Sequence, residues 1–252
     1  MTSQTHDELL ARFAAGDRQA LARLLTLVEL GDAPELPPVD EAKPCTRVIG
    51  IAGSGGAGKS TLVGAFVKFL REQNLRVAIL ASDPQSPRTG GALLGDRVRV
   101  TMDPNDDGVY FRSLSTRGAP GGLAEAVAGD IPCLKRFGFD VILVETVGIG
   151  QDQTAVRDVV QTLVLVVTPG TGDEIQWEKA GLIELADILV VNKSDMPSAD
   201  RVQHQLRRAL SLSPEAENIP ILATIATSGE GVAELWNAMV AHGDALPDVA
   251  VP

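Results

Sequence analysis

Short runs of β-branched and aliphatic residues alternate with amphipathic helical stretches over most of this chain, and that alternation constrains the fold more than any other feature. Near-continuous apolar runs are expected of parallel strands, because helices cover both faces of such a sheet. The repeat predicts an α/β fold with a doubly wound, mostly parallel sheet, in which ligands bind at the carboxyl ends of the strands. The expected strands are 48–52, 77–81, 141–144, 163–167, 188–191 and 221–225, and the expected helices are 59–73, 123–137, 174–186, 199–210 and 231–242.

The first 44 residues differ from the rest in composition. Residues 7–31 predict two short helices broken near Gly16-Asp17, and the proline-rich, acidic stretch 31–44 predicts a linker. With more acidic than basic residues, this arm is expected to be a solvated or partner-facing layer rather than part of the core. The expected division is a helical arm and linker at 1–44, a nucleotide-binding domain at 45–245 and a short tail at 246–252.

The charge balance narrows the range of partners. The 22 basic and 33 acidic side chains give a net charge of −11, which argues against nucleic acid as a partner. Cys45 and Cys133 form no CxxC pair, which argues against a disulfide framework and favours a cytoplasmic protein. No apolar run approaches the ~20 residues that span a bilayer, so no membrane association is expected.

A glycine-rich motif, GSGGAGKS, follows the first expected strand and opens the next helix. Its spacing and context match a phosphate-binding loop, in which successive backbone N–H groups and the helix N-terminus bind phosphate oxygens. Lys59 is expected to reach the β- and γ-phosphates, and the Ser60 hydroxyl to ligate Mg²⁺. The predicted nucleotide-binding residues of this loop are Gly55, Gly56, Ala57, Gly58, Lys59, Ser60 and Thr61.

A second motif, NKSD, leaves the expected strand 188–191. The carboxylate of Asp195 can accept hydrogen bonds from guanine N1–H and N2–H₂, a donor pair that adenine lacks, so the motif favours GTP over ATP. Asn192 and Lys193 belong to the same predicted guanine site, and the loop near Ala226 and Thr227 is expected to back the base.

An acidic residue ends another buried strand. Glu145 is placed to hold Mg²⁺ or its water, and the Gly148 amide to meet the γ-phosphate, so the following loop is expected to sense hydrolysis. Gln151 lies nearby and is a candidate for positioning water when a partner orders the loop. Between 83 and 99, Asp83 and Asp96 fit a loop that folds over Mg²⁺ and nucleotide.

These motifs, with GGALLGDR, VETVGIGQDQTAV and TPGTGDEIQWEKAGLIELADILVVNKSD, closely resemble the MeaB/ArgK group of P-loop GTPases, the chaperones of adenosylcobalamin-dependent acyl-CoA mutases. The resemblance runs from about Leu9 to about Met239 and extends to the G-domain fused within isobutyryl-CoA mutases, which suggests a stand-alone, MeaH-like chaperone. It implies a GTPase that gates cobalamin loading from an adenosyltransferase, permits release of damaged cofactor and protects the mutase. Adenosylcobalamin would be involved only through the partner.

The resemblance also implies roles for individual residues. Lys59, Glu145 and Gly148 would be catalytic, and Ser60, Asp83, Asp96 and Glu145 would surround Mg²⁺. Residues 169–179 match the family's third switch, which couples the nucleotide state to the mutase. The implied switch and partner-coupling residues are Arg99, Gln151, Asp173, Gln176, Trp177 and Lys179.

Two departures from the family pattern concern partners. Trp177 stands where relatives often have a small residue, which suggests different packing of the third switch or an anchor for a partner. Relatives carry a C-terminal dimerisation arm that has no counterpart after Met239, so a homodimer is expected to use another surface.

Other functions compatible with the motifs remain open. A small-molecule kinase would pass the γ-phosphate to an organic acceptor, a nickel-insertion GTPase would add metal-binding histidines or cysteines, and a binding module would not hydrolyse GTP. Only three scattered histidines, His6, His204 and His242, are present, and the cobalamin-binding motif DxHxxG is absent. The sequence therefore favours a GTPase without its own cobalamin or nickel ligands.

Overall fold

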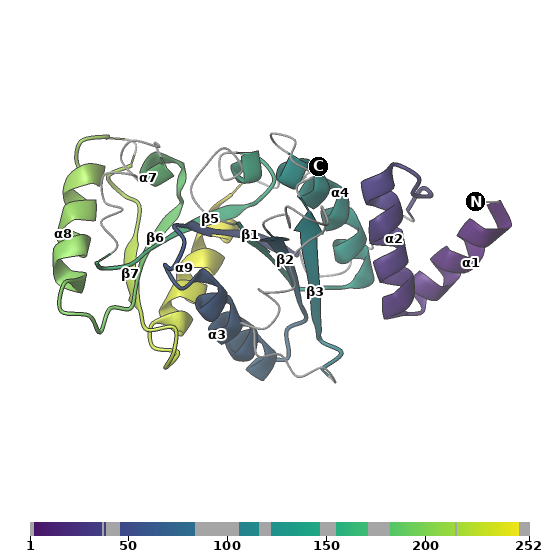
Figure 1. The fold of residues 1–252 in the computed structure, drawn as a ribbon, viewed down its shortest axis with the longest axis horizontal. Helices are drawn as coiled ribbons and strands as arrows, with labels where there is room; N and C mark the ends of the chain where they lie inside the picture. Colours follow the sequence, from purple (N-terminus) through teal and green to yellow (C-terminus); the bar gives the residue numbers. More distant parts are fainter. Residues whose placement is uncertain are drawn as a thin grey trace, which may run out of the picture.

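The computed structural model of the chain describes residues 3–36, 38, 46–83, 106–115, 122–146, 155–170, 182–214 and 216–246. Within this part of the chain a seven-stranded parallel sheet runs in the order β3-β2-β4-β1-β5-β6-β7 (Figure 1). The predicted doubly wound α/β fold is confirmed. The strands are β1 Arg47–Gly53, β2 Val77–Asp83, β3 Val109–Ser115, β4 Val141–Glu145, β5 Thr162–Val167, β6 Ile188–Asn192 and β7 Ile221–Thr224.

Helices cover both faces of the sheet (Figure 1). One face packs against α3 (Lys59–Glu72) and α9 (Val232–Ala245), and the other against α4 (Gly122–Phe137), α7 (Leu182–Leu185) and α8 (Ala199–Leu210). Strand β1 supplies alternate residues to each face, with Val48 in one hydrophobic cluster and Ile49 in the other. Among the described helices, none has both the length and the apolar character needed to cross a bilayer.

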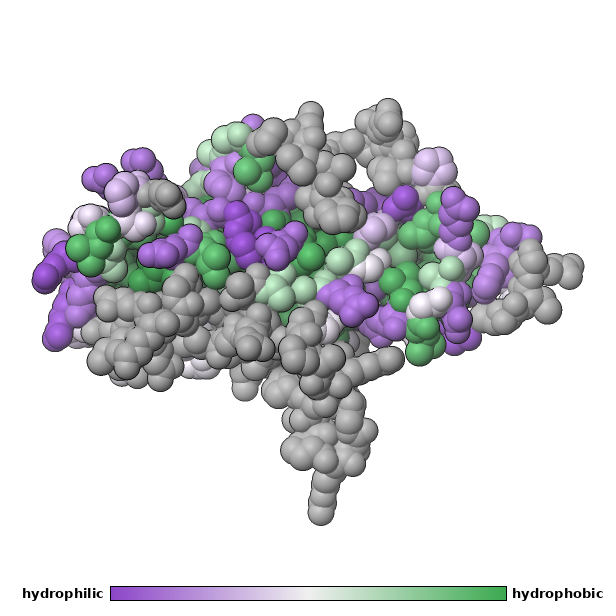
Figure 2. All heavy atoms as spheres, turned by 90° about the horizontal axis from the view of Figure 1, so that it is seen from above, coloured by the Kyte–Doolittle hydropathy of each residue, from purple (hydrophilic) through white to green (hydrophobic). Residues whose placement is uncertain are grey.

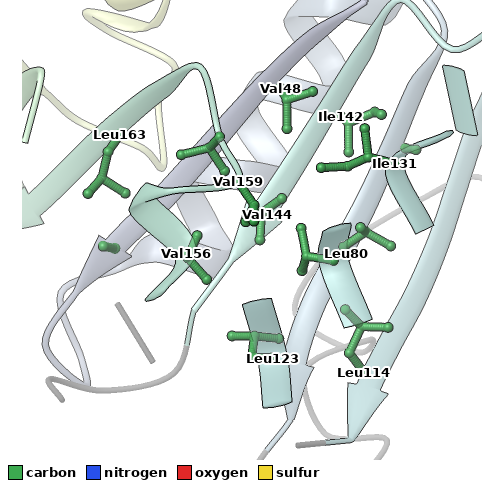
Figure 3. Close-up of a cluster of buried hydrophobic side chains, with 14 of the residues drawn as sticks. Val48, Leu80, Leu114, Leu123, Ile131, Ile142, Val144, Val156, Val159 and Leu163 are labelled. Atoms are coloured by element: carbon green, nitrogen blue, oxygen red, sulfur yellow. The ribbon is translucent and has the colours of Figure 1, made fainter. Parts of the chain in front are cut away.

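The larger cluster lies between the sheet and α4. Leu80 of β2 and Val144 of β4 meet Leu123 and Ile131 of α4 there, together with Val156 from the helical turn 155–157 (Figure 3). All five side chains are fully buried. Burial of a side chain of this size stabilises the fold by about 1.5–3 kcal/mol, so the sheet is a rigid platform for the loops at its carboxyl ends.

Two helices precede the sheet, as predicted. Helix α1 (Ser3–Ala14) and helix α2 (Arg18–Leu30) are separated at Gly16, whose φ of 82° suits glycine. Asp17 caps α2 by accepting hydrogen bonds from the backbone N–H groups of Gln19 and Ala20.

The expectation that this arm is a solvated layer outside the core is wrong for its apolar face. Leu21, Leu24 and Leu25 of α2 are completely buried and belong to the same hydrophobic cluster as α4. Phe13 of α1 also reaches Phe137 of α4, with ring centroids 5.4 Å apart. The charge of the arm lies on its other faces. Hydrophilic side chains are frequent at both ends of the molecule, over α8 and over α1 and α2 (Figure 2). The division at residue 45 stays a prediction, since residues 39–45 lie outside the described part.

Strand β3 was not predicted. It is an edge strand, paired only with β2 within the described sheet, and its sequence VYFRSLS is interrupted by an arginine. Arg112 points into the α2–α4 interface, where it contacts Glu29 of α2 at 2.7 Å and Asp130 of α4 at 3.3 Å. A charged residue with buried partners cannot be distinguished by pattern from a solvent-facing one.

Asp130 is a buried acid in this interface, with no exposed surface. Burial raises the pKa of its carboxyl to about 7, and Glu29 raises it further, while Arg112 opposes the shift. Tyr110 and Arg18 also lie in this region, with the Arg18 guanidinium 5.6 Å from the tyrosine ring centroid. Near neutral pH the Asp130 carboxyl therefore exchanges a proton.

This proton makes stability depend on pH. The folded chain retains it up to about pH 7, whereas the unfolded chain releases it near the model value of 3.8, so the free energy of unfolding falls as pH rises through this interval. We expect Asp130→Asn to raise the free energy of unfolding more at pH 8 than at pH 5, by on the order of 2–4 kcal/mol. Urea denaturation at both pH values measures the difference.

Asp106→Asn is the matched control. Arg71 lowers the pKa of Asp106, so that carboxyl is ionised in both states between pH 5 and pH 8. Its replacement should change stability equally at the two pH values. The same equal change in Asp130→Asn would contradict the assignment of a proton to Asp130.

Candidate functional site

The site lies at the carboxyl ends of the central strands. Strand β1 has β4 on one side and β5 on the other, so the loops that follow these three strands meet at one edge of the sheet. The chain passes from β1 through residues 54–58 into α3. This is the reversal point of the strand order, where doubly wound folds bind their ligands.

Two glycines of the loop are required by close packing. Gly53 has a φ of 148°, and a Cβ there would overlap the Val166 carbonyl oxygen of β5. Gly58 has a φ of 88°, and a Cβ there would overlap the side-chain nitrogen of Asn192. A residue with a side chain at either position would push the loop away from its neighbours.

The loop ends in a helix whose N-terminus has no side-chain cap. Gly58 is the N-cap residue of α3 and offers no side-chain acceptor to the first-turn N–H groups. Such N–H groups and the helix dipole favour an anion. Lys59 is 8% exposed, and its ammonium group donates to the carbonyl oxygens of Gly53 and Ser54, both at 2.9 Å. The loop thus holds a buried cation beside its N–H groups.

Ser60 and Glu145 form a buried oxygen pair next to the loop. The Ser60 hydroxyl donates to Glu145 Oε1 at 2.6 Å, and the two residues are 9% and 4% exposed. A hydroxyl and a carboxylate are hard oxygen donors of the kind that Mg²⁺ prefers. These residues therefore fit a magnesium ion adjacent to bound phosphates.

Asn192 ties the two predicted nucleotide loops together. Its side-chain NH₂ donates to the Ala57 carbonyl oxygen at 2.9 Å. Its side-chain oxygen accepts from the Thr224 hydroxyl at 3.1 Å and from the Ala226 backbone N–H at 3.2 Å. With Asn192 only 1% exposed, these bonds fix the phosphate loop relative to the loop after β7.

Lys193 adds an exposed link to the phosphate loop. Its ammonium group donates to the Gly56 carbonyl oxygen at 3.0 Å, and its φ of 56° turns the chain away from β6. Asp195 follows in the same turn and is exposed. The side chain predicted to recognise guanine therefore lies one turn from the phosphate loop.

A groove of about 620 Å³ adjoins these loops. It lies between α3 and residues 226–229, and its lining includes Thr61, Ala226 and Thr227. The three residues predicted to contact nucleotide from these two elements thus share one concave surface.

The described structure brings together the predicted residues of the two loops and places Glu145 beside them. Asp83 is the last residue of β2, and its side chain is outside the description. Within the described part of the chain, no three His, Cys, Asp or Glu side chains are grouped to hold a metal. The predicted residues that lie outside the described part are Gly148, Asp96, Arg99, Gln151, Asp173, Gln176, Trp177 and Lys179.

Sequence reasoning missed Thr224. This threonine lies opposite Asn192 in the β6–β7 register and is completely buried. Its position as the last residue of a buried strand, level with the asparagine of NKSD, was a usable signal. The β7 strand was predicted but not its pairing.

An ion pair fixes the chain where it re-enters the fold after residues 84–105. Arg71 at the end of α3 binds both carboxylate oxygens of Asp106, at 2.8 and 2.9 Å. The Arg71 hydrogen bond lowers the pKa of Asp106 and keeps it charged. Helix α3 is therefore attached both to the phosphate loop and to the start of β3.

Comparisons with known proteins agree with this geometry. A family model described as methylmalonyl-CoA mutase-associated GTPase MeaB matches residues 21–250. A protein of Pyrococcus horikoshii named as a GTPase is 46% identical over 247 residues, covering 95% of this chain and 78% of the relative. The fused isobutyryl-CoA mutase of Geobacillus kaustophilus is 38% identical over 236 residues, covering 86% of this chain and 22% of that protein. The crystal structure of a LAO/AO transport system kinase has a TM-score of 0.70 and 26% identity, covering 98% of this chain and 77% of that one.

The Asn192 contacts generate a prediction for ligand affinity. Asn192→Ala removes three buried hydrogen bonds and frees the phosphate loop from the loop after β7. We expect binding of guanine nucleotides to weaken by about ten- to a hundredfold. Isothermal titration calorimetry with GDP measures this, with thermal unfolding as a check that the fold is intact.

Thr224→Val is the graded control. It removes one of the two groups that donate to the Asn192 oxygen and leaves the bond to Ala57 in place. Its effect should be clearly smaller than that of Asn192→Ala. An Asn192→Ala variant that folds and binds GDP like the wild type would refute the positioning role.

Proposed function

Because the chain belongs to the MeaB family of mutase-associated GTPases, we propose that it is a GTP-hydrolysing chaperone of a cobalamin-dependent acyl-CoA mutase. The observation that carries the proposal is the direct link between a phosphate loop and an NKSD turn. Asn192 and Lys193 each bond to a carbonyl of the phosphate loop. One ligand with a guanine base and a phosphate chain would engage both loops.

The proposed reaction is attack of water on the γ-phosphorus of GTP, giving GDP and phosphate. Lys59 and the loop N–H groups would stabilise the charge that develops on the phosphate oxygens, so that catalysis depends on positioning and electrostatics. Mg²⁺, when bound by Ser60 and Glu145, would add positive charge at the β- and γ-phosphates. Asp83 and Asp96 are proposed as further carboxylates of this magnesium site.

The switch roles belong to the same proposal. The Gly148 amide is proposed to contact the γ-phosphate, and Gln151 to position water when a partner orders the loop. A second proposed group, in residues 169–179 and at Arg99, transmits the nucleotide state to the mutase. Its members are Arg99, Asp173, Gln176, Trp177 and Lys179.

A mutase partner is supported by two of the comparisons. The family description contains the words mutase-associated, and one relative carries the matching region within a fused isobutyryl-CoA mutase. We propose that the chain gates adenosylcobalamin loading from an adenosyltransferase, permits release of damaged cofactor and protects the radical enzyme. A homodimer, where one forms, is proposed to use a surface other than a C-terminal arm.

Base recognition gives a specific prediction. Asp195→Asn replaces the acceptor of guanine N1–H and N2–H₂ with an amide that can pair with the C2 carbonyl of xanthine. We expect GTP hydrolysis to fall and XTP hydrolysis to rise, with the ratio of kcat/KM values changing by at least about a hundredfold. Phosphate release with each nucleotide measures this ratio. Asp200→Asn, an exposed acid in the first turn of α8, is the control that should leave the ratio unchanged.

Coupling to the mutase is tested at Lys179. We expect Lys179→Ala to keep basal GTP hydrolysis near the wild-type rate and to reduce its stimulation by an added mutase. The measurement compares phosphate release with and without isobutyryl-CoA mutase and methylmalonyl-CoA mutase. Equal stimulation of variant and wild type would remove Lys179 from the coupling surface, and no stimulation of the wild type by either enzyme would contradict the proposed partner.

The LAO/AO kinase name of one structural relative makes phosphoryl transfer to a small molecule the alternative to examine. The two reactions differ in where the γ-phosphate goes. With GTP labelled at the γ-position, the proposed function predicts that all label is recovered as inorganic phosphate. Label on an added organic acceptor would favour the kinase.

A further inference from the structure

The loops that follow β4 and β5 return to the fold at two residues that contact each other. After β4 the description resumes at the helical turn 155–157, which contains Arg157. After β5 and residues 168–170 it resumes at α7, and Asp187 stands between α7 and β6. Arg157 Nη2 lies 3.0 Å from Asp187 Oδ1. The pair therefore joins the return points of the two loops that flank the phosphate loop.

Asp187 is fixed to the sheet. Its backbone N–H donates to the Leu163 carbonyl oxygen at 2.9 Å, and its Oδ2 accepts from the Leu163 N–H at 2.7 Å. The residue is thus bonded twice to the start of β5. Its remaining oxygen, Oδ1, faces Arg157.

A histidine of α9 holds the same carboxylate from the other side. His242 Nε2 lies 3.3 Å from Asp187 Oδ1, and His242 Nδ1 lies 2.9 Å from the hydroxyl of Thr162. Thr162 is 2% exposed at the first position of β5. With an Nε2–H tautomer, the imidazole donates to Asp187 and accepts from Thr162. The carboxylate is consequently held in one orientation toward Arg157.

Arg157 is also attached to the core through its neighbour. Val156 is completely buried in the cluster between the sheet and α4, and Arg157 Nη1 bonds to the Val160 carbonyl oxygen at 3.4 Å. Displacement of the turn 155–157 would therefore pull on a group that is anchored to β5 and α9.

We infer that Arg157 and Asp187 are a positioning pair that couples the loop after β4 to the loop after β5, so that a change of nucleotide sensed by one loop reaches the other. The inference rests on the proposed function, in which the loop after β4 senses the γ-phosphate. It adds the route by which that state reaches residues 171–181. Neither side chain contacts the phosphate loop in the described structure.

The competing role is a purely structural tie. The pair is partly exposed, and such ion pairs contribute about 0–1 kcal/mol to stability. Arg47 and Asp244 form a second arginine–aspartate pair at 2.7 Å that also involves α9, but it joins the start of β1 rather than either loop. Loss of that pair should affect stability to a similar extent and coupling not at all.

The test is hydrogen–deuterium exchange of the full chain with GDP and with a non-hydrolysable GTP analogue. In the wild type we expect amide protection in 147–154 and in 171–181 to change between the two nucleotides. In Arg157→Gln the change in 171–181 should shrink by about threefold or more while the change in 147–154 persists, an effect within the range for mutations in coupling networks. Asp187→Asn keeps an acceptor for the Leu163 N–H and should give the same result.

The variants separate the possible outcomes. The double variant should resemble either single variant, because both remove one interaction, Arg157→Lys should restore part of the response, and Arg47→Gln should match the wild type. Nucleotide affinity and thermal unfolding confirm that each variant is folded and loaded. A wild-type response in both segments that Arg157→Gln and Asp187→Asn leave intact would overturn the inference alone. No response of either segment in the wild type would overturn the proposed switch function and the inference with it.

Discussion

The side-chain amide of Asn192 is the contact on which the arrangement of the site depends. It is buried at the end of β6 and bonds at once to the phosphate loop, to β7 and to the loop after β7. A buried polar group that loses a partner costs about 1–3 kcal/mol, so these three elements resist separation. The spacing between the phosphate-binding and base-binding loops is therefore established by the protein. Affinity that would otherwise be lost to ordering the loops is retained for the nucleotide.

The N-terminal helices add a third layer that also bears on the site. Helix α2 covers the outer face of α4 with buried leucines, and Arg112 of β3 joins it through Glu29. Arg18 of α2 bonds to the carbonyl oxygens of Asp106 and Val109, where the chain enters β3. The layer thus stabilises the edge strand and the point at which residues 84–105 return to the sheet. Asp130 makes this interface sensitive to protonation, since its buried carboxyl has a pKa near neutrality.

The parts of the fold that the sequence predicted are those governed by local patterns. Six strands were readable as apolar runs, and the phosphate loop and the NKSD turn as motifs with fixed spacing. Strand β3 was missed because Arg112 interrupts its pattern, and its burial depends on Glu29 and Asp130 from other elements. The bond from Thr224 to Asn192 and the contact between Arg157 and Asp187 depend on strand order, which no single run of residues encodes. The roles of Lys179 and Trp177 came from the family resemblance and remain predictions.

The two ion pairs at the return points occupy places where control over the loops is greatest. Each loop leaves the sheet from the end of a strand whose position is set by hydrogen bonds and buried packing, so its return point is the remaining variable. Asp106 is held by Arg71, at the far end of a 14-residue helix that begins at the phosphate loop. Such a helix is about 21 Å long and rigid over that length, so a shift at the phosphate loop is carried to Asp106. Arg157 and Asp187 tie the other two loops to each other rather than to α3. The nucleotide therefore has two mechanical routes out of the site, one along α3 toward the N-terminal helices and one across β5 toward α9.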